Sequence, residues 1–225
     1  MGLSSEHIAI EETADGSRTL FVPELNEHYH SVKGALTESK HIFIKMGFKH
    51  SKVLNPAILE IGFGTGLNAF LTLLEAGRTK RKVRYTGIEL YPLKEETLKS
   101  LDYPEIICPE HSEDYDRLHS ISWEKEETIT AYFTLRKIEN DFTRYVFPEN
   151  CFDIIYFDAF APEKQPEMWT QALFDSLYKS LRIDGILTTY CAKGIVRRML
   201  QTAGFVVERL PGPPGGKREI LRATK

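Results

Sequence analysis

The sequence predicts an α/β fold built on a mostly parallel, doubly wound sheet, and three observations support this. An apolar run at 57–61 leads into a glycine-rich turn and then a helical pattern over 67–77. Further apolar runs alternate with amphipathic stretches. The last two expected strands, 205–210 and 218–223, lie too close in sequence for a crossover helix and must pair antiparallel. Five parallel strands and this antiparallel terminal hairpin make a seven-stranded sheet.

A small β-hairpin and helix extension is expected to precede that sheet. The stretches 8–13 and 19–25 flank the turn dipeptide Asp15-Gly16, which is typical of a hairpin. Residues 35–44 then show helical spacing. We therefore divide the chain into an N-terminal piece, 1–50, that caps the crevice, and a main domain, 51–225.

The remaining elements follow in order. A strand over 83–90 ends near Glu89, and the next helix, 92–101, is entered through a proline. Residues 102–123 are irregular and predicted to be an insertion. The other expected elements are a strand within 128–138, a strand at 152–157, a helix at 165–181, a turn at 182–185, a strand at 186–190 and a helix at 193–203.

Composition sets outer limits on what the protein does. With 225 residues, 42% hydrophobic and 27% charged, the chain can bury one sizeable core. It has no apolar stretch near the ~20 residues of a membrane helix. The start, from Met1 to Glu6, lacks the pattern of a leader peptide or of a myristoylation signal. We expect a cytoplasmic protein without a membrane partner.

The three cysteines, Cys108, Cys151 and Cys191, are too scattered for a disulfide framework or a zinc site, and are expected to be buried small apolar residues. No metal is predicted. The net charge of −3 is unevenly distributed, because residues 191–225 carry eight basic side chains against two acids, or +6, and the rest carries −9. This pattern is typical of a local polyanion site, although a solvated helix face explains part of it.

The glycine turn indicates which nucleotide is bound. A dehydrogenase fingerprint would need glycine at position 67, where this chain has Leu67. The observed Glu-x-Gly-x-Gly-x-Gly is the form found in S-adenosylmethionine (SAM) methyltransferases. Glu60 can attract the ammonium or sulfonium of that ligand. A glycine turn with no ligand is the alternative. The expected cofactor-binding residues are Glu60, Gly62, Phe63, Gly64, Gly66, Asn68, Glu89 and Asp141.

Strand ends supply the remaining acids of the site. Glu89 lies 23 residues beyond Gly66, where an acid in Rossmann-like folds meets the ribose hydroxyls (~20 residues). Asp141 is either an adenine contact or an ordinary turn residue. Asp158 and Phe160 follow the fourth strand, beside the first, and are therefore aimed at the reaction.

Several motifs together resemble the methyltransferase domain of the MnmC family. They are Glu60 to Asn68, Asp158-Ala-Phe-Ala-Pro162 with Met168-Trp169, Pro211-Gly212 ahead of Gly216-Lys217-Arg218-Glu219, and the N-terminal Asp15-Gly16-Ser17, Tyr29-His30-Ser31 and Gly34 to Ser39. The resemblance implies a Rossmann-like class I SAM-dependent methyltransferase. Its substrate would be tRNA, in which the aminomethyl group of 5-aminomethyl-2-thiouridine at the wobble position becomes methylaminomethyl.

The bifunctional MnmC enzyme continues into an FAD-dependent oxidoreductase, which this chain does not contain. We therefore expect a stand-alone form and a separate enzyme that supplies the aminomethyl intermediate. The amine must attack as a neutral, oriented nucleophile, and Asp158 is the predicted group that orients and deprotonates it. The other predicted substrate-binding residues are Phe160, which could pack on the extruded uracil, Pro162, Lys193, Lys217 and Arg218.

Bland interpretations compete with these assignments. Asp158 could cap the next helix, and Phe160 could be a core aromatic. A SAM or decarboxylated-SAM enzyme acting on a small amine is one rival function. A non-catalytic Rossmann-like protein that binds SAM or RNA is the other, although the retained glycine loop and strand-end acids disfavour it.

Overall fold

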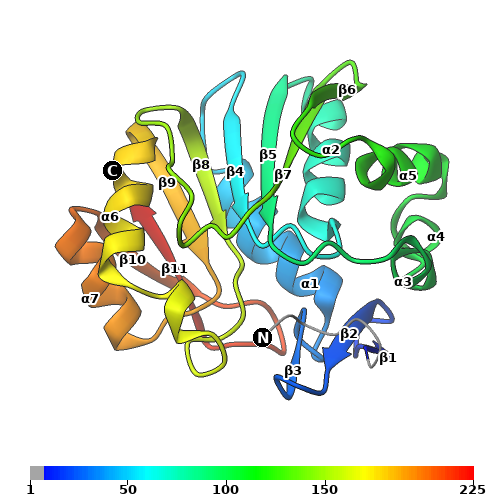
Figure 1. Ribbon diagram of the computed structural model, residues 1–225, viewed down its shortest axis with the longest axis horizontal. Coiled ribbons are helices and arrows are strands. Elements are labelled where there is room, and N and C mark those ends of the chain that lie inside the picture. Colours follow the sequence, from blue (N-terminus) through cyan, green and yellow to red (C-terminus); the bar gives the residue numbers. More distant parts are fainter. Residues whose placement is uncertain (1–7) are drawn as a thin grey trace.

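Residues 8–225 are described by a computed structural model as two sheets with helices around the larger one (Figure 1). The strands are β1 (Ala9–Glu12), β2 (Arg18–Val22), β3 (Glu27–His28), β4 (Ala57–Ile61), β5 (Val83–Glu89), β6 (Glu126–Thr130), β7 (Phe133–Glu139), β8 (Phe152–Phe157), β9 (Leu181–Thr189), β10 (Val206–Pro211) and β11 (Glu219–Thr224). The helices are α1 (Ala35–Ser39), α2 (Leu67–Thr79), α3 (Glu95–Ser100), α4 (Tyr103–Ile107), α5 (Ser112–Ser120), α6 (Gln171–Ser180) and α7 (Gly194–Ala203), with the π-helical η1 (Lys40–Phe48) and the 3-10 turns η2 (Pro109–His111) and η3 (Pro166–Met168).

The large sheet confirms the doubly wound α/β prediction. Its strand order is β10-β11-β9-β8-β4-β5-β7-β6, and the five strands from β9 to β7 run parallel. The terminal strands β10 and β11 pair antiparallel, as expected. The sheet has eight strands rather than seven because the stretch predicted as one strand within 128–138 is a hairpin, in which β6 pairs antiparallel with β7.

Helices cover both faces of the sheet because its central strands are apolar on both sides. In β4, Ile58 packs into a core shared with α1, η1, α2 and α5. Its neighbours Leu59 and Ile61 pack into a second core with α6 and α7. This alternation is the period of two of a strand buried on both faces. The three layers leave the carboxyl ends of the parallel strands to form a site.

Residues 102–123 are not the irregular insertion that the sequence predicted. They form α4, η2 and α5, because Tyr103, Tyr115 and Leu118 are buried in one of the cores while the polar residues between them face outward. A short amphipathic helix with few apolar residues gives a weak periodic signal, and its charged residues masked it here.

Two further boundaries differ from expectation. Helix α6 begins at Gln171 and not at 165, because the Thr170 hydroxyl accepts a hydrogen bond from the Leu173 amide (3.3 Å) and caps the helix there. The expected turn at 182–185 is part of β9, in which Asp184 adopts a positive φ of 63° and the pairing with β8 shifts register.

Asp15 joins the N-terminal hairpin turn to α1. Its carboxylate accepts hydrogen bonds from the Ser17 amide (3.1 Å), the Thr13 hydroxyl (2.8 Å) and the Thr37 amide in the first turn of α1 (2.7 Å). The hairpin turn therefore caps a helix 22 residues away. Leu20 and Phe43 share a core with Ile58, so this segment and the sheet bury apolar surface together.

Other sequence expectations concern the surface. Cys191 is buried, but Cys108 and Cys151 are partly exposed, contrary to prediction, and all three are free. No helix within 8–225 is both long and apolar enough to span a membrane. The expectation about Met1 to Glu6 concerns residues outside the part that the structure describes.

Candidate active site

A cavity of about 690 Å³ opens where the five parallel strands end. Its walls come from the segments that follow β4, β5, β7, β8 and β9, and residues 27–32 of the N-terminal segment also line it. Strands β4 and β8 are neighbours, and the chain leaves them toward opposite faces of the sheet, which makes this the topological switch point where such sheets bind ligands. The volume suits a small molecule of nucleoside size.

The glycine loop after β4 forms the floor of this cavity. Gly62 has φ 85°, and a Cβ there would lie 2.6 Å from the backbone oxygen of Asp158. Gly64 has φ 49°, and a Cβ would lie 3.2 Å from the Tyr29 ring. Glycine is required at both positions because a side chain would be strained and would fill the space beside the cavity. Phe63 also lines the cavity, whereas Gly66, at the start of α2, does not.

Glu89 fastens that loop to the end of β5. One oxygen accepts a hydrogen bond from the Gly64 amide (3.0 Å), and the other accepts from the Leu90 and Tyr91 amides (2.9 Å each). Burial raises the pKa of Glu89, although these three amides partly oppose the effect. The oxygen bonded to Gly64 accepts only this one hydrogen bond and so has a further lone pair available to a ligand hydroxyl.

Asn68, in the first turn of α2, links two carboxylates. Its Nδ2 donates to Glu60 Oε1 (2.9 Å) and to Asp158 Oδ2 (2.8 Å). Glu60 is 1% exposed and does not line the cavity, and its Oε1 holds Asn68 in place. The predicted contact between Glu60 and a cationic ligand stays a prediction, and the structure places the side chain behind Asn68. The reason is that the side chain at this strand position points into the core.

Asp158 lines the cavity at the end of β8 and is partly exposed to it. Burial raises its pKa to about 7, and the nearby Glu38 charge adds to the rise, whereas the Asn68 hydrogen bond and the Lys217 charge oppose it. A carboxyl group with such a pKa exchanges protons near neutral pH, which is what a general base requires. The structure places Asp158 beside the glycine loop, where the sequence predicted it.

Asp141 combines the two interpretations that the sequence left open. It lines the cavity after β7, and its Oδ1 also accepts hydrogen bonds from the Thr143 amide (3.0 Å) and hydroxyl (2.6 Å). Arg144 lies 3.5 Å from its other oxygen. It is thus a turn residue at the cavity wall, and contact with an adenine stays a prediction.

Aromatic side chains also line the cavity. The Phe160 and Tyr29 rings meet edge to face at 5.1 Å, and both line it. The loop that carries Phe160 is held by two aromatic donors, since Trp169 Nε1 donates to the Phe160 carbonyl (2.8 Å) and Tyr190 OH donates to the Ala159 carbonyl (2.8 Å). This is the structural role of the Trp169 motif seen in the sequence. Pro162 lies in the same loop but does not line the cavity.

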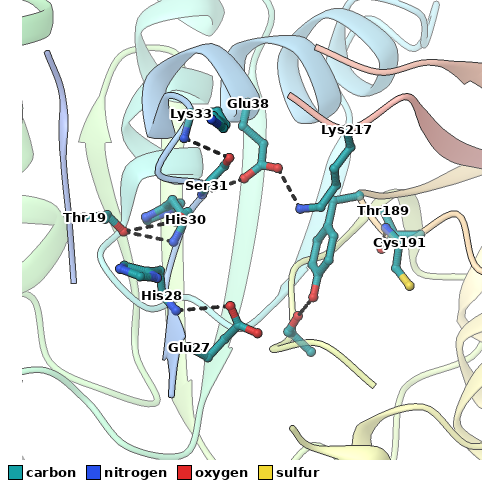
Figure 2. A network of polar contacts seen from close by, with 12 residues as sticks. Thr19, Glu27, His28, His30, Ser31, Lys33, Glu38, Thr189, Cys191 and Lys217 are labelled. Atoms are coloured by element: carbon teal, nitrogen blue, oxygen red, sulfur yellow. Dashed lines mark hydrogen bonds and ion pairs between the residues drawn. The ribbon is translucent and has the colours of Figure 1, made fainter. Parts of the chain in front are cut away.

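An ion pair crosses the cavity wall between the two ends of the chain. Lys217 Nζ donates to Glu38 Oε1 (2.9 Å), as Figure 2 shows, and lies 4.0 Å from the centroid of the Tyr190 ring. The other Glu38 oxygen accepts from the Ser31 amide (3.0 Å). Lys217 is therefore paired at the cavity wall although its side chain is 43% exposed, so the sequence prediction of a presented cation omitted its acidic partner.

The remaining predicted residues lie outside the cavity. Lys193, at the start of α7, forms an ion pair with Glu163. Arg218 is exposed. Sequence reasoning assigned no role to Tyr29, Glu38 or Tyr190. The first two stood inside motifs that were noted, and Tyr190 could have been found as the residue that ends a parallel strand.

Comparisons with known proteins agree with this geometry. Residues 116–225 match the family described as S-adenosyl-L-methionine-dependent methyltransferase. The tRNA 5-methylaminomethyl-2-thiouridine biosynthesis bifunctional protein MnmC of Cupriavidus metallidurans is 30% identical over 224 residues, which is 91% of this chain and 32% of that protein. The protein of the same name from Leptospira borgpetersenii is 32% identical over 211 residues, or 86% of this chain and 31% of that protein. The chain thus spans about a third of these relatives.

Solved structures show the same relationship. The crystal structure of MnmC2 from Aquifex aeolicus has a TM-score of 0.77 and 25% sequence identity, and covers 96% of this chain and 69% of that chain. Spermidine synthase from Thermotoga maritima, with a TM-score of 0.55 and 14% identity over 98% of this chain and 72% of that chain, shares the fold. The chain is thus similar to SAM-dependent methyltransferases over 116–225 and to the MnmC proteins over most of its length, and these relatives imply SAM as the cofactor.

The cavity residues fit SAM. Residues with acceptor oxygens line it: Glu89, Asp141 and Asn68, whose buried Oδ1 has no hydrogen-bond partner among residues 8–225. Gly62 and Gly64 place no side chains of their own at the floor. SAM carries an ammonium, ribose hydroxyls and an adenine amino group, all of which donate to such oxygens.

Proposed function

We propose that this methyltransferase acts on tRNA and methylates the primary amine of 5-aminomethyl-2-thiouridine at the wobble position, giving 5-methylaminomethyl-2-thiouridine. The single observation that carries the proposal is Asp158, a carboxyl group with a pKa of about 7 held by Asn68 between the glycine loop and an aromatic recess. The name of the MnmC relatives supports the choice of substrate.

The cofactor would lie against the glycine loop. Gly62, Gly64, Asn68, Glu89 and Asp141 are the residues that would hold it. When bound, SAM supplies a methyl group on a sulfonium, which is open to attack by a neutral amine.

Asp158 prepares the amine for that attack. As a carboxylate it accepts a hydrogen bond from the amine, which points the nitrogen lone pair away from Asp158, and it takes the proton that the nitrogen must lose. Its raised pKa makes it basic enough for this task near neutral pH. Asn68 fixes the direction of the carboxylate, since its Nδ2 already donates to Asp158 on one side and to Glu60 on the other.

The aromatic recess suits a nucleobase. An enzyme that acts on a base in RNA must take the base out of its stack, and the cost falls when the base finds a new aromatic partner. Tyr29 and Phe160 offer such surfaces at the cavity wall. The expectation that residues 1–50 cap the site is part of this proposal, because Tyr29 comes from that segment.

The RNA itself would approach along the basic C-terminal part of the chain. Arg218 is exposed, directly after the cavity-lining Lys217, and its side chain can contact a phosphate. Lys193 is also near the surface, although its ion pair with Glu163 must open first. A separate enzyme would supply the aminomethyl group, since no reaction of this site makes it.

One experiment tests the function. The protein is incubated with SAM and tRNA from cells that lack the terminal methylation, and digested nucleosides are analysed by mass. Methylaminomethylthiouridine is the expected product, and Asp158→Asn protein is the control. A parallel reaction with small amines in place of tRNA tests the rival function. Methylated small amine without methylated nucleoside would contradict the proposal.

A further inference from the structure

Glu38 and Tyr190 together form a binding site for an ammonium group. Glu38 is nearly buried, with a side chain 10% exposed, and the Ser31 amide holds one of its oxygens (3.0 Å) so that the other faces the cavity. The Tyr190 ring lies beside it, and its hydroxyl is tied to the Ala159 carbonyl, which fixes the ring. A carboxylate next to an aromatic face is the usual surrounding of a bound alkylammonium.

The chain fills this site with its own cation. Lys217 Nζ lies 2.9 Å from Glu38 Oε1 and 4.0 Å from the Tyr190 ring centroid. The side chain enters from a loop whose ends are joined by a hydrogen bond from the Gly212 amide to the Arg218 carbonyl (3.0 Å). Lys217 itself is 43% exposed, so the loop delivers it from the surface to a site that is otherwise buried.

We propose that Lys217 determines substrate specificity: its ammonium occupies the cation site of Glu38 and Tyr190, so that the cavity accepts one substrate amine at Asp158 and rejects diamines and polyamines. This inference rests on the proposed function for the position of the substrate amine. A second ammonium on the substrate would meet the Lys217 ammonium in place of an open carboxylate. Two like charges that close to one another repel. A substrate with one amine meets no such obstacle.

Removal of the Lys217 ammonium should therefore open the site to a diamine. In Lys217→Met, a protonated diaminobutane can place one amine at Asp158 and the other at Glu38. We expect it to bind about ten-fold more tightly than to the wild-type protein, the gain typical of one charged hydrogen bond with an aromatic neighbour. Butylamine has one amine and can reach only one of the two carboxylates, so its gain in Lys217→Met should be smaller than the gain of diaminobutane. Calorimetric titration near neutral pH, with and without SAM, measures both affinities.

Three variants control this test. Lys33→Met removes the same charge from an exposed residue that does not line the cavity, and should bind the diamine as the wild type does. Lys217→Arg keeps a cation and should keep the exclusion. Adding Glu38→Gln to Lys217→Met removes the carboxylate and should abolish the gain. If Lys217→Met does not give a native melting curve, Lys217→Gln takes its place.

Equal diamine affinity in wild-type and folded Lys217→Met protein would overturn the inference, as would an equal gain in Lys33→Met. The outcome is separate from that of the proposed function, since diamine binding is measured without methyl transfer. A diamine gain in protein that does not methylate tRNA would keep the cation site and reject the tRNA assignment. Methylation of tRNA without the gain would do the reverse.

Discussion

At the scale of single residues, two side chains, Asn68 and Lys217, are the partners of three carboxylates of the site. Asn68 donates to Glu60 and to Asp158 through one nitrogen, and Lys217 neutralises Glu38. The sequence predicted Asp158, Glu89 and the glycines because strand ends in a parallel sheet mark a site. It did not reveal that Glu60 points inward, which depends on the face of β4 that it occupies, or that Lys217 is paired, because its partner Glu38 is 179 residues away.

The Asp158 side chain is expected to serve the chemistry and not the cofactor. Asp158→Asn keeps the hydrogen-bonding shape but cannot take a proton. SAM affinity by calorimetry should stay within experimental error of the wild type, while turnover of tRNA falls about 10²-fold or more. Loss of SAM affinity equal to the loss of turnover would contradict this role, as would full activity.

The acidic limb of the pH profile of turnover should shift one way when Glu38 is replaced and the other way when its partner Lys217 is replaced. Activity needs ionised Asp158 and is lost as pH falls through its pKa of about 7. Glu38 raises that pKa, so Glu38→Gln should shift the acidic limb of kcat/KM to lower pH. Lys217 lowers it, so Lys217→Met should shift the limb to higher pH. Parallel shifts in both variants would indicate a merely structural pair.

At the scale of elements, buried strands and the helix α2 were predictable because their apolar periodicity is strong. The elements missed were amphipathic but rich in charge, like α5, or part of a hairpin with a tight turn, like β6 and β7. The start of α6 was set by a cap at Thr170, a hydrogen bond that spacing alone does not reveal.

The glycine loop after β4 should bind SAM only while position 64 has no side chain. Gly64→Val puts methyl groups beside the Tyr29 ring at the cavity floor, where even a Cβ would lie at 3.2 Å. SAM binding by calorimetry should be lost, with the circular dichroism spectrum unchanged. Gly215→Val is the matched control, because its φ of +70° is similarly strained but nothing lies within 4 Å. A normal SAM affinity in Gly64→Val would contradict the assignment of this loop as part of the SAM site.

The turn at Asp15 should stabilise α1 from a distance. Asp15→Ala removes the acceptor of the Thr37 amide, and loss of such a helix cap costs about 1 kcal/mol of unfolding free energy. Burial raises the Asp15 pKa, but hydrogen bonds from Ser17, Thr37 and Thr13 outweigh this and hold it below its usual range. This contribution is therefore complete at neutral pH and fades in strong acid, as the pH falls through the lowered pKa. Urea unfolding of Asp15→Ala and Asp15→Asn at two pH values measures it.

At the scale of the whole molecule, the predicted parallel sheet, terminal hairpin and SAM cofactor agree with the structure and its relatives. Charge distribution predicted a basic C-terminal part, but pairing decides which cations face outward. Lys193, Lys217 and Arg209 have acidic partners, whereas Arg218 is exposed. Composition measures charge and says nothing of such pairing.

Arg218 should therefore account for a measurable part of RNA binding. Phosphate contacts release counterions, so affinity falls with salt by a slope of roughly −0.7 to −0.9 per contact. Arg218→Ala should raise the KM for tRNA and flatten this slope by about one contact, with SAM affinity unchanged. Identical salt dependence in wild type and variant would show that Arg218 does not contact a phosphate of the RNA.

The contact between Glu38 and Lys217 also bears on when the site exists during folding. It joins residues 179 positions apart, and contacts that close so long a span form late because their closure entropy must be recovered from contacts already made. We therefore expect the cation site of Glu38 and Tyr190 to form only after β11 has paired with β9 and η1 has packed on the sheet. Before that stage, Glu38 would lack its Lys217 partner.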